Sequence, residues 1–170
     1  MGSGNIEGGS KAPLVIAGIE SGVLGGVFML AWLALLSLLQ GRSVWSIPNL
    51  LASTFYGDAA LSRGFRWSTV SGLALHLLMS AAAGLLFALL AGGMASRKRV
   101  MLLGVGAGAA WYFLSLDFFW KHINPMVPLY ASGAGPFIGH LGLGIFLGSV
   151  PKFRDELDAP VPAAEPVGGD

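Results

Sequence analysis

Four stretches of the chain are continuously apolar over about the length of helix that crosses a lipid bilayer, and this pattern restricts the possible folds most. A transmembrane helix needs roughly 20 predominantly apolar residues, whereas the strands of a membrane barrel alternate between apolar and polar residues. The sequence therefore predicts an all-α integral membrane protein with four transmembrane helices. These helices are expected at residues 14–39, 68–91, 100–120 and 133–150.

The composition agrees with that prediction. Of the 170 residues, 54% are hydrophobic and only 11% are charged, whereas about a quarter of the residues in a soluble domain are charged. The two ends of the chain carry little apolar sequence and cannot bury enough surface to fold. We therefore expect a disordered N-terminal segment over residues 1–12, a four-helix transmembrane domain over 13–151 and a disordered cytoplasmic tail over 152–170.

The sequence argues against several classes of function. The net charge of +1 leaves no basic surface large enough to neutralise a run of phosphates, so no nucleic-acid partner is expected. The absence of cysteine excludes disulfides and thiolate metal sites. The chain has no paired carboxylates, His-Glu-x-x-His motif, nucleophile elbow or phosphate-binding glycine loop. The prediction is a protein that is not an enzyme and has no dedicated metal site.

Basic residues predict which side of the membrane each loop faces. The cluster Arg-Lys-Arg at 97–99 lies between the second and third predicted helices, while Lys11 precedes the first helix and Lys152 follows the fourth. By the positive-inside rule these regions face the cytoplasm. The pattern is typical of small multi-pass proteins of the bacterial inner membrane, with both termini cytoplasmic.

The loops on the opposite side carry amphipathic aromatic residues, which settle at the headgroup level of a membrane. Asp117 and Lys121 are four residues apart, the spacing of an ion pair along a helix. Residues 47–65 have apolar side chains near helical spacing, and we expect either a short helix on the membrane surface or an ordered loop packed on the bundle. The predicted interfacial anchors are Trp45, Trp67, Asp117, Trp120 and Lys121.

Small residues recur at every fourth position of the predicted helices. This spacing lets two helix backbones approach closely and gain packing energy in lipid. It predicts tight packing within one bundle or against the helices of a partner. The predicted packing residues are Gly18, Gly22, Gly26, Gly72, Ser80, Gly84, Gly104, Gly108, Gly144 and Gly148.

The two halves of the chain resemble each other. The stretches "IPNLLAS" and "GLALHLLMSAAAG" in the first half correspond to "VPLYAS" and "GPFIGHLGLGIFLG" in the second, which aligns His76 with His140. Each half contains two predicted helices and enters the membrane in the same direction. One hypothesis is a tandem two-helix repeat with a pseudo-twofold axis along the membrane normal. The alternative is chance similarity between two simple apolar sequences.

His76 and His140 are the residues of the predicted helices with the most distinctive chemistry. Counted along each helix, both lie roughly 10 to 12 Å into the membrane. The favoured interpretation is that each forms a structural hydrogen bond across a helix interface, without a cofactor. The alternatives are ligation of a b-type haem or a (bacterio)chlorophyll, and a proton or substrate path.

These observations favour a non-catalytic accessory or structural subunit of a membrane protein complex, which acts through small-residue helix packing. Its expected partners are the lipid bilayer and either other membrane subunits or further copies of itself. The first alternative is an electron-transfer subunit that binds haem or a chlorophyll-type pigment through His76 and His140. The second alternative is a component of a small transporter or channel.

Overall fold

A computed structural model describes residues 11–159, and every regular element in that range is a helix. The order of elements along the chain follows the apolar stretches of the sequence, with short helices in the connections. The elements are α1 (Ala12–Leu39), α2 (Ser46–Tyr56), η1 (Gly57–Ala60), α3 (Trp67–Ala91), α4 (Arg97–Phe113), η2 (Leu114–Trp120), α5 (Lys121–Ile123), α6 (Met126–Ala131), α7 (Ala134–Gly148) and α8 (Val150–Asp158).

Four helices are long and apolar enough to cross a membrane, as the sequence predicts. They comprise α1, α3, the continuous helix from α4 to α5, and the helix formed by α7 and α8. Large apolar side chains such as Leu78, Leu90 and Leu102 are exposed on the outside of the bundle. Contiguous apolar surfaces of this kind mark contact with a membrane or a partner.

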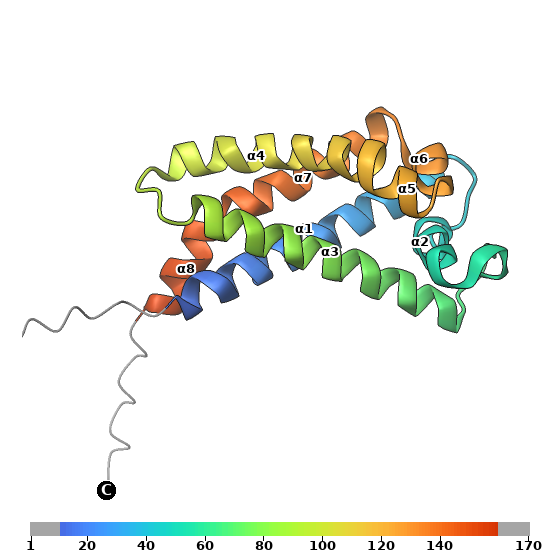
Figure 1. Ribbon diagram of the computed structural model, residues 1–170, viewed down its shortest axis with the longest axis horizontal. Helices are drawn as coiled ribbons and strands as arrows, with labels where there is room; N and C mark the ends of the chain where they lie inside the picture. The colour runs from blue at the N-terminus through green and yellow to red at the C-terminus, as the bar shows by residue number, and fades with distance from the viewer. Residues whose placement is uncertain (1–10, 160–170) are drawn as a thin grey trace, which may run out of the picture.

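The four long helices pack in the spatial order α3, α1, α7, α4 (Figure 1). Helix α1 packs against α3 on one side and α7 on the other, and α4 packs against α7, whereas α3 and α4 touch little. Trp32 of α1 donates a hydrogen bond from Nε1 to the backbone oxygen of Gly135 at 2.8 Å, which joins α1 to the start of α7. The two outer helices, α3 and α4, therefore flank a central pair.

Glycines bring the paired helices into backbone contact. A Cβ on Gly22 of α1 would overlap the backbone oxygen of Ser80 on α3, and a Cβ on Gly84 would overlap the backbone of α1. In the second pair, a Cβ on Gly104 or Gly108 of α4 would overlap backbone atoms of α7. No other residue type allows two helices to approach so closely.

The remaining small residues of the predicted packing set also lie against neighbouring elements. A Cβ on Gly72 would overlap the backbone oxygen of Pro48, so this glycine accommodates α2. Gly18 and Gly26 of α1 face α3, where the neighbour of Gly26 is the Ser80 side chain. Gly144 and Gly148 of α7 face α4. The small-residue surfaces are thus covered within the chain.

Both described ends of the chain lie at one end of the bundle (Figure 1). Arg97 pairs with Asp155 at 2.5 Å, and Arg154 donates to the backbone oxygen of Gly92 at 2.8 Å, so α8 is tied to the connection between α3 and α4. We call this end, with residues 97–99, the basic end. The opposite end, which carries α2, α5 and α6, is the loop end.

Helix α8 corrects the predicted tail, because residues 152–158 are helical. Pro151 stands in the first turn of α8, where proline fits since its missing N–H has no partner there. Val150 is buried and Phe153 packs on the core, which fixes the helix. The predicted N-terminal segment ends earlier than expected, since α1 begins at Ala12. The rest of both predicted disordered segments lies outside the described residues.

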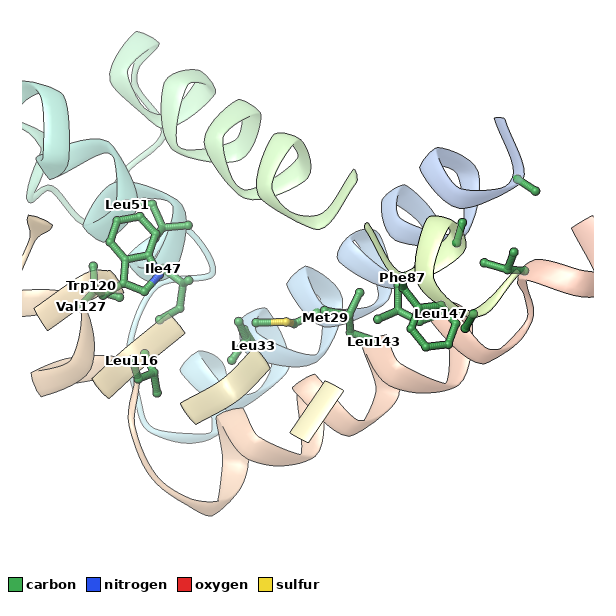
Figure 2. Packing of buried hydrophobic residues seen from close by; sticks show 14 of the residues in the cluster. Met29, Leu33, Ile47, Leu51, Phe87, Leu116, Trp120, Val127, Leu143 and Leu147 are labelled. Atoms are coloured by element: carbon green, nitrogen blue, oxygen red, sulfur yellow. The ribbon is translucent and has the colours of Figure 1, made fainter. Parts of the chain in front are cut away.

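The stretch 47–65 contains α2, and α2 packs into the bundle instead of lying on its surface. Ile47, Leu50 and Leu51 are buried and belong to the hydrophobic core. Figure 2 shows Ile47 and Leu51 beside Trp120 of the α4–α5 helix, with Val127 nearby. Helix α2 is therefore inserted between the longer helices and fills the loop end of the bundle.

The structure also differs from the expected interfacial anchors. Trp120 is only 6% exposed and lies in the core, not at the surface. Residues 114–120 form a π-helix, in which hydrogen bonds run from i to i+5 and each turn is wider. Side chains four residues apart then no longer lie on the same face of the helix. The ion pairs within residues 11–159 do not include one between Asp117 and Lys121.

Two glycines on α4 test the backbone packing. Gly108→Ala should lower the free energy of unfolding by about 1–3 kcal/mol, because the added Cβ overlaps the backbone of α7. Gly106→Ala is the matched control, since a Cβ there meets no heavy atom within 4 Å. Alanine should be neutral or stabilise by up to about 1 kcal/mol at that position. Thermal unfolding in detergent measures both, and equal melting temperatures would contradict the packing.

Candidate functional site

A cavity lies between α3 and α4, over the central pair α1 and α7. Helices α2 and α6 line it at the loop end. The cavity volume is about 60 Å³, and a water molecule needs roughly 10–15 Å³ of such a cavity. The cavity therefore has room for a few water molecules or one ion. Its lining is mainly apolar, with Trp111, Leu116 and Trp120 on the side of the α4–α5 helix.

His76 and His140 both line this cavity, although they come from α3 and α7, which touch little. Both residues are buried, with 8% and 5% of their surface exposed. The structure thus brings together the two histidines that the sequence singles out.

Each histidine is oriented by one hydrogen bond to a backbone oxygen. His76 donates from Nε2 to Gly26 of α1 at 3.0 Å, and His140 donates from Nδ1 to Pro136, one turn earlier on α7, at 2.9 Å. A backbone oxygen can only accept, so the bonded nitrogen carries the proton in both rings. The Tyr112 and His140 rings pack at nearly right angles, with centroids 5.2 Å apart.

The second nitrogen of each ring is left with a lone pair. His76 Nδ1 and His140 Nε2 have no hydrogen-bond partner within the described part of the chain, and neither is sealed off by protein atoms. A histidine that binds a metal typically donates its other N–H to a carbonyl, which fixes the ring. The two free nitrogens can therefore accept a hydrogen bond from water or coordinate a metal.

Two thioethers complete the set of soft donors. Met29 of α1 and Met79 of α3 line the same cavity. The hydroxyls of Ser80 and Ser115 also line it, but each donates its hydrogen to a backbone oxygen of its own helix. Within residues 11–159 there is no group of three His, Cys, Asp or Glu residues placed to hold a metal. An ion bound here would need the methionine sulfurs.

Sequence reasoning misses both methionines. Met79 follows His76 by three residues, so both lie on one helical face, and this spacing was an available signal. Met29 follows Gly26, whose backbone oxygen holds the His76 ring. No pattern within α1 alone identifies Met29, because its place depends on how α1 packs against α3.

Two asparagines that the sequence analysis also misses fix the loop end of the cavity. Asn49 of α2 is 1% exposed, and its Nδ2 donates to the backbone oxygens of Ser62 and Gly64 at 2.7 and 3.0 Å. Its Oδ1 accepts from the Thr69 hydroxyl at 2.6 Å. Asn124 also holds α2, because its Nδ2 donates to the hydroxyls of Ser53 and Thr54. The signals were the pairs Pro-Asn at 48–49 and Asn-Pro at 124–125.

The other predicted anchors lie at the loop end but outside the cavity. Trp67 is 88% exposed at the start of α3. Trp45 packs edge-on against Phe65, with ring centroids 5.1 Å apart. Asp117 and Lys121 are exposed.

No protein-family model, curated protein or solved structure matches this chain.

Asn49→Ala tests how firmly α2 is seated. The substitution removes the acceptor of the buried Thr69 hydroxyl and the Nδ2 donor to two backbone oxygens, of which the Gly64 oxygen still accepts from the Ser62 hydroxyl, so stability should fall by about 1–3 kcal/mol. Amide hydrogen exchange over residues 61–66 should also become faster, since Asn49 holds that loop. The control is Ser71→Ala, which removes an exposed hydrogen bond to Tyr56 and should change stability by no more than about 0.5 kcal/mol. Equal effects of the two variants would contradict the role of Asn49.

Proposed function

We propose that this chain is a non-catalytic multi-pass membrane protein that holds a metal-centred ligand between His76 and His140. The observation that carries the proposal is the convergence of the two imidazoles on one cavity, each with a free nitrogen and a fixed ring. A structural histidine needs only one hydrogen bond across an interface. Two histidines that line one cavity, each with a free nitrogen, are what a ligand site requires.

The room in the cavity favours a bare ion as the ligand. A b-type haem or a chlorophyll needs far more space than about 60 Å³, so α3 and α4 would have to separate to admit it. The available donors are imidazole nitrogens and thioether sulfurs, which are neutral and soft. Thioethers select Cu(I), and imidazole also binds copper. A monovalent ion is also less costly to bury than a divalent one. We therefore infer a soft monovalent ion such as Cu(I).

A membrane location supports the same proposal. The four long apolar helices suit a bilayer, and both described ends lie at the basic end with residues 97–99. By the positive-inside rule we place the basic end in the cytoplasm, as in a bacterial inner membrane. The His76–His140 cavity then lies within the bilayer, where a carboxylate site would be costly and neutral donors are not.

An accessory subunit that binds partners through its glycine surfaces is the alternative. The geometry favours it less, because the predicted packing residues contact other elements of the same chain. A transporter or channel component needs a polar path, whereas the cavity lining is mainly apolar. The internal duplication stays a hypothesis. Gly22 faces the backbone oxygen of Ser80, and Gly104 faces the backbone oxygen of Gly144. A duplication that aligns His76 with His140 would pair these contacts in the same way.

Metal content and absorption test the ligand directly. The protein is produced with added copper in a host that makes haem, and is purified in mild detergent under reducing conditions. We expect about one copper ion per chain, from two imidazole and two thioether donors. His76→Ala and His140→Ala should each lose it. His122→Ala is the matched control, because His122 is exposed and bonds only to the Phe118 oxygen of its own helix.

Three results would contradict the bare ion. A Soret band that disappears in the His76 and His140 variants would identify a tetrapyrrole instead. Copper retained by the double variant would place the ion elsewhere. Neither copper nor a Soret band would leave the histidines with structural hydrogen bonds alone. Melting curves recorded for each variant show whether loss of metal reflects loss of the fold.

Single cysteines test the orientation, because the chain has none of its own. Gly64 is exposed, and a Cβ there has open space, so Gly64→Cys reports the loop end. Ser96 is exposed beside the basic cluster and makes no side-chain cap, so Ser96→Cys reports the basic end. An impermeant thiol reagent should label Gly64→Cys in spheroplasts and leave Ser96→Cys unlabelled until the membrane is opened. The reverse pattern would invert the topology.

A further inference from the structure

A second cavity lies at the loop end, between the connection after α1, helix α2, the loop at 61–63 and helix α6. Its volume is about 270 Å³, several times that of the histidine cavity. A volume near 300 Å³ is at the lower end of the range for small-molecule sites. This loop-end pocket is not part of the metal site proposed above.

Two arginines without counter-charges line the loop-end pocket. Arg42 donates from Nη2 to the side-chain oxygen of Gln40, and Arg63 donates from Nη2 to the backbone oxygen of Gly41 at 3.3 Å. No carboxylate lines the pocket. The ion pairs in the described range all involve Arg97, Lys152 or Arg154, at the other end of the bundle. The pocket therefore concentrates uncompensated positive charge.

Arg42, which lines this pocket, has one unsatisfied atom. Arg42 Nε is buried and has no hydrogen-bond acceptor, and it is the one buried side-chain nitrogen or oxygen of residues 11–159 in that state. Buried polar groups nearly always have a partner, so this unpaired donor adds to the unbalanced positive charge of the Arg42 guanidinium. A guanidinium offers a planar fork of donors that matches the oxygens of a phosphate or a carboxylate.

The remaining walls of the pocket are largely apolar. Leu50 comes from α2, Leu61 from the following loop and Met126 from α6. The hydroxyls of Ser46 and Ser62 lie among the lining groups as further polar contacts. A small hydrated anion would leave these apolar walls unused, whereas an anion that carries an apolar chain would cover them.

We infer that the loop-end pocket binds an anionic amphiphile. Its phosphate or carboxylate head lies between Arg42 and Arg63 and accepts hydrogen bonds from their guanidinium groups, while its apolar chain lies against Leu61 and Met126. The proposed membrane placement puts this pocket at headgroup level, so an anionic lipid is one source and a free amphiphile is another. The site does not depend on the metal ligand at His76 and His140.

Thermal unfolding of the full chain in an uncharged detergent tests the site. Dodecyl phosphate should raise the melting temperature with saturation, because a ligand that binds only the folded state stabilises it. Inorganic phosphate at the same concentration should have little effect. Phosphatidylglycerol, but not phosphatidylcholine, should compete with dodecyl phosphate if the natural source is a lipid. Failure of that competition assigns the pocket to a free amphiphile.

Charge-matched variants separate the pocket from general attraction. Arg42→Gln with Arg63→Gln should weaken dodecyl phosphate binding by about tenfold or more, from the loss of charged hydrogen bonds. The control, Arg66→Gln with Lys121→Gln, removes the same charge from exposed positions at the loop end and should bind normally. Arg42→Lys keeps the charge but loses the planar fork of guanidinium donors, and should bind more weakly than the wild type.

Three results would overturn the inference. Equal binding by the two double variants would show that overall charge suffices. An equal shift with inorganic phosphate would remove the role of the apolar walls. No saturable shift with dodecyl phosphate would mean that the pocket takes no anionic amphiphile. Copper content measured on the same variants should stay at the wild-type level, so failure here is distinguishable from failure of the metal site.

Discussion

Backbone contact between glycine-bearing helices is the constraint on which the rest of the structure depends. Lipid tails are as apolar as leucine side chains, so in a bilayer no hydrophobic effect draws two apolar helices together. Helices there associate through van der Waals packing at close range. Gly22 and Gly84 provide that contact between α1 and α3, and Gly104 and Gly108 provide it between α4 and α7. Because each contact is backbone against backbone, even one methyl group at these positions must displace a helix.

The same contacts create the space for a site. The α1–α3 and α4–α7 pairs are joined through α1 and α7, and the outer helices α3 and α4 touch little. A cavity lies between them, and α2, which packs against Gly72, closes its loop end. Inserting α2 brings backbone and hydroxyl groups into the interior, where they must find partners. Asn49 and Asn124 supply those partners, which explains why the insertion of α2 requires the two asparagines.

The sequence predicts what is local and misses what depends on packing. Length and continuous apolar character predict the four long helices, and the spacing of four places His76 and Ser80 on one face. The partner of each face is not encoded in that spacing. Pro151 illustrates the difficulty, because proline suits both the end of one helix and the first turn of the next. The sequence analysis places Trp120 at the surface, because it assumes the angular positions of a regular α-helix, whereas residues 114–120 form a π-helix.

The packing and the proposed metal site are connected through Gly26. Its backbone oxygen accepts from His76 Nε2 across the α1–α3 interface, and a glycine here lets α3 come close enough for that bond. His140 bonds instead within its own helix through Nδ1. The free nitrogens of the two histidines are therefore different, Nδ1 of His76 and Nε2 of His140, although both residues line one cavity. If the halves arose by duplication, this difference makes the site asymmetric. A metal ion can be coordinated by either imidazole nitrogen, so the two unlike free nitrogens would both serve as its ligands.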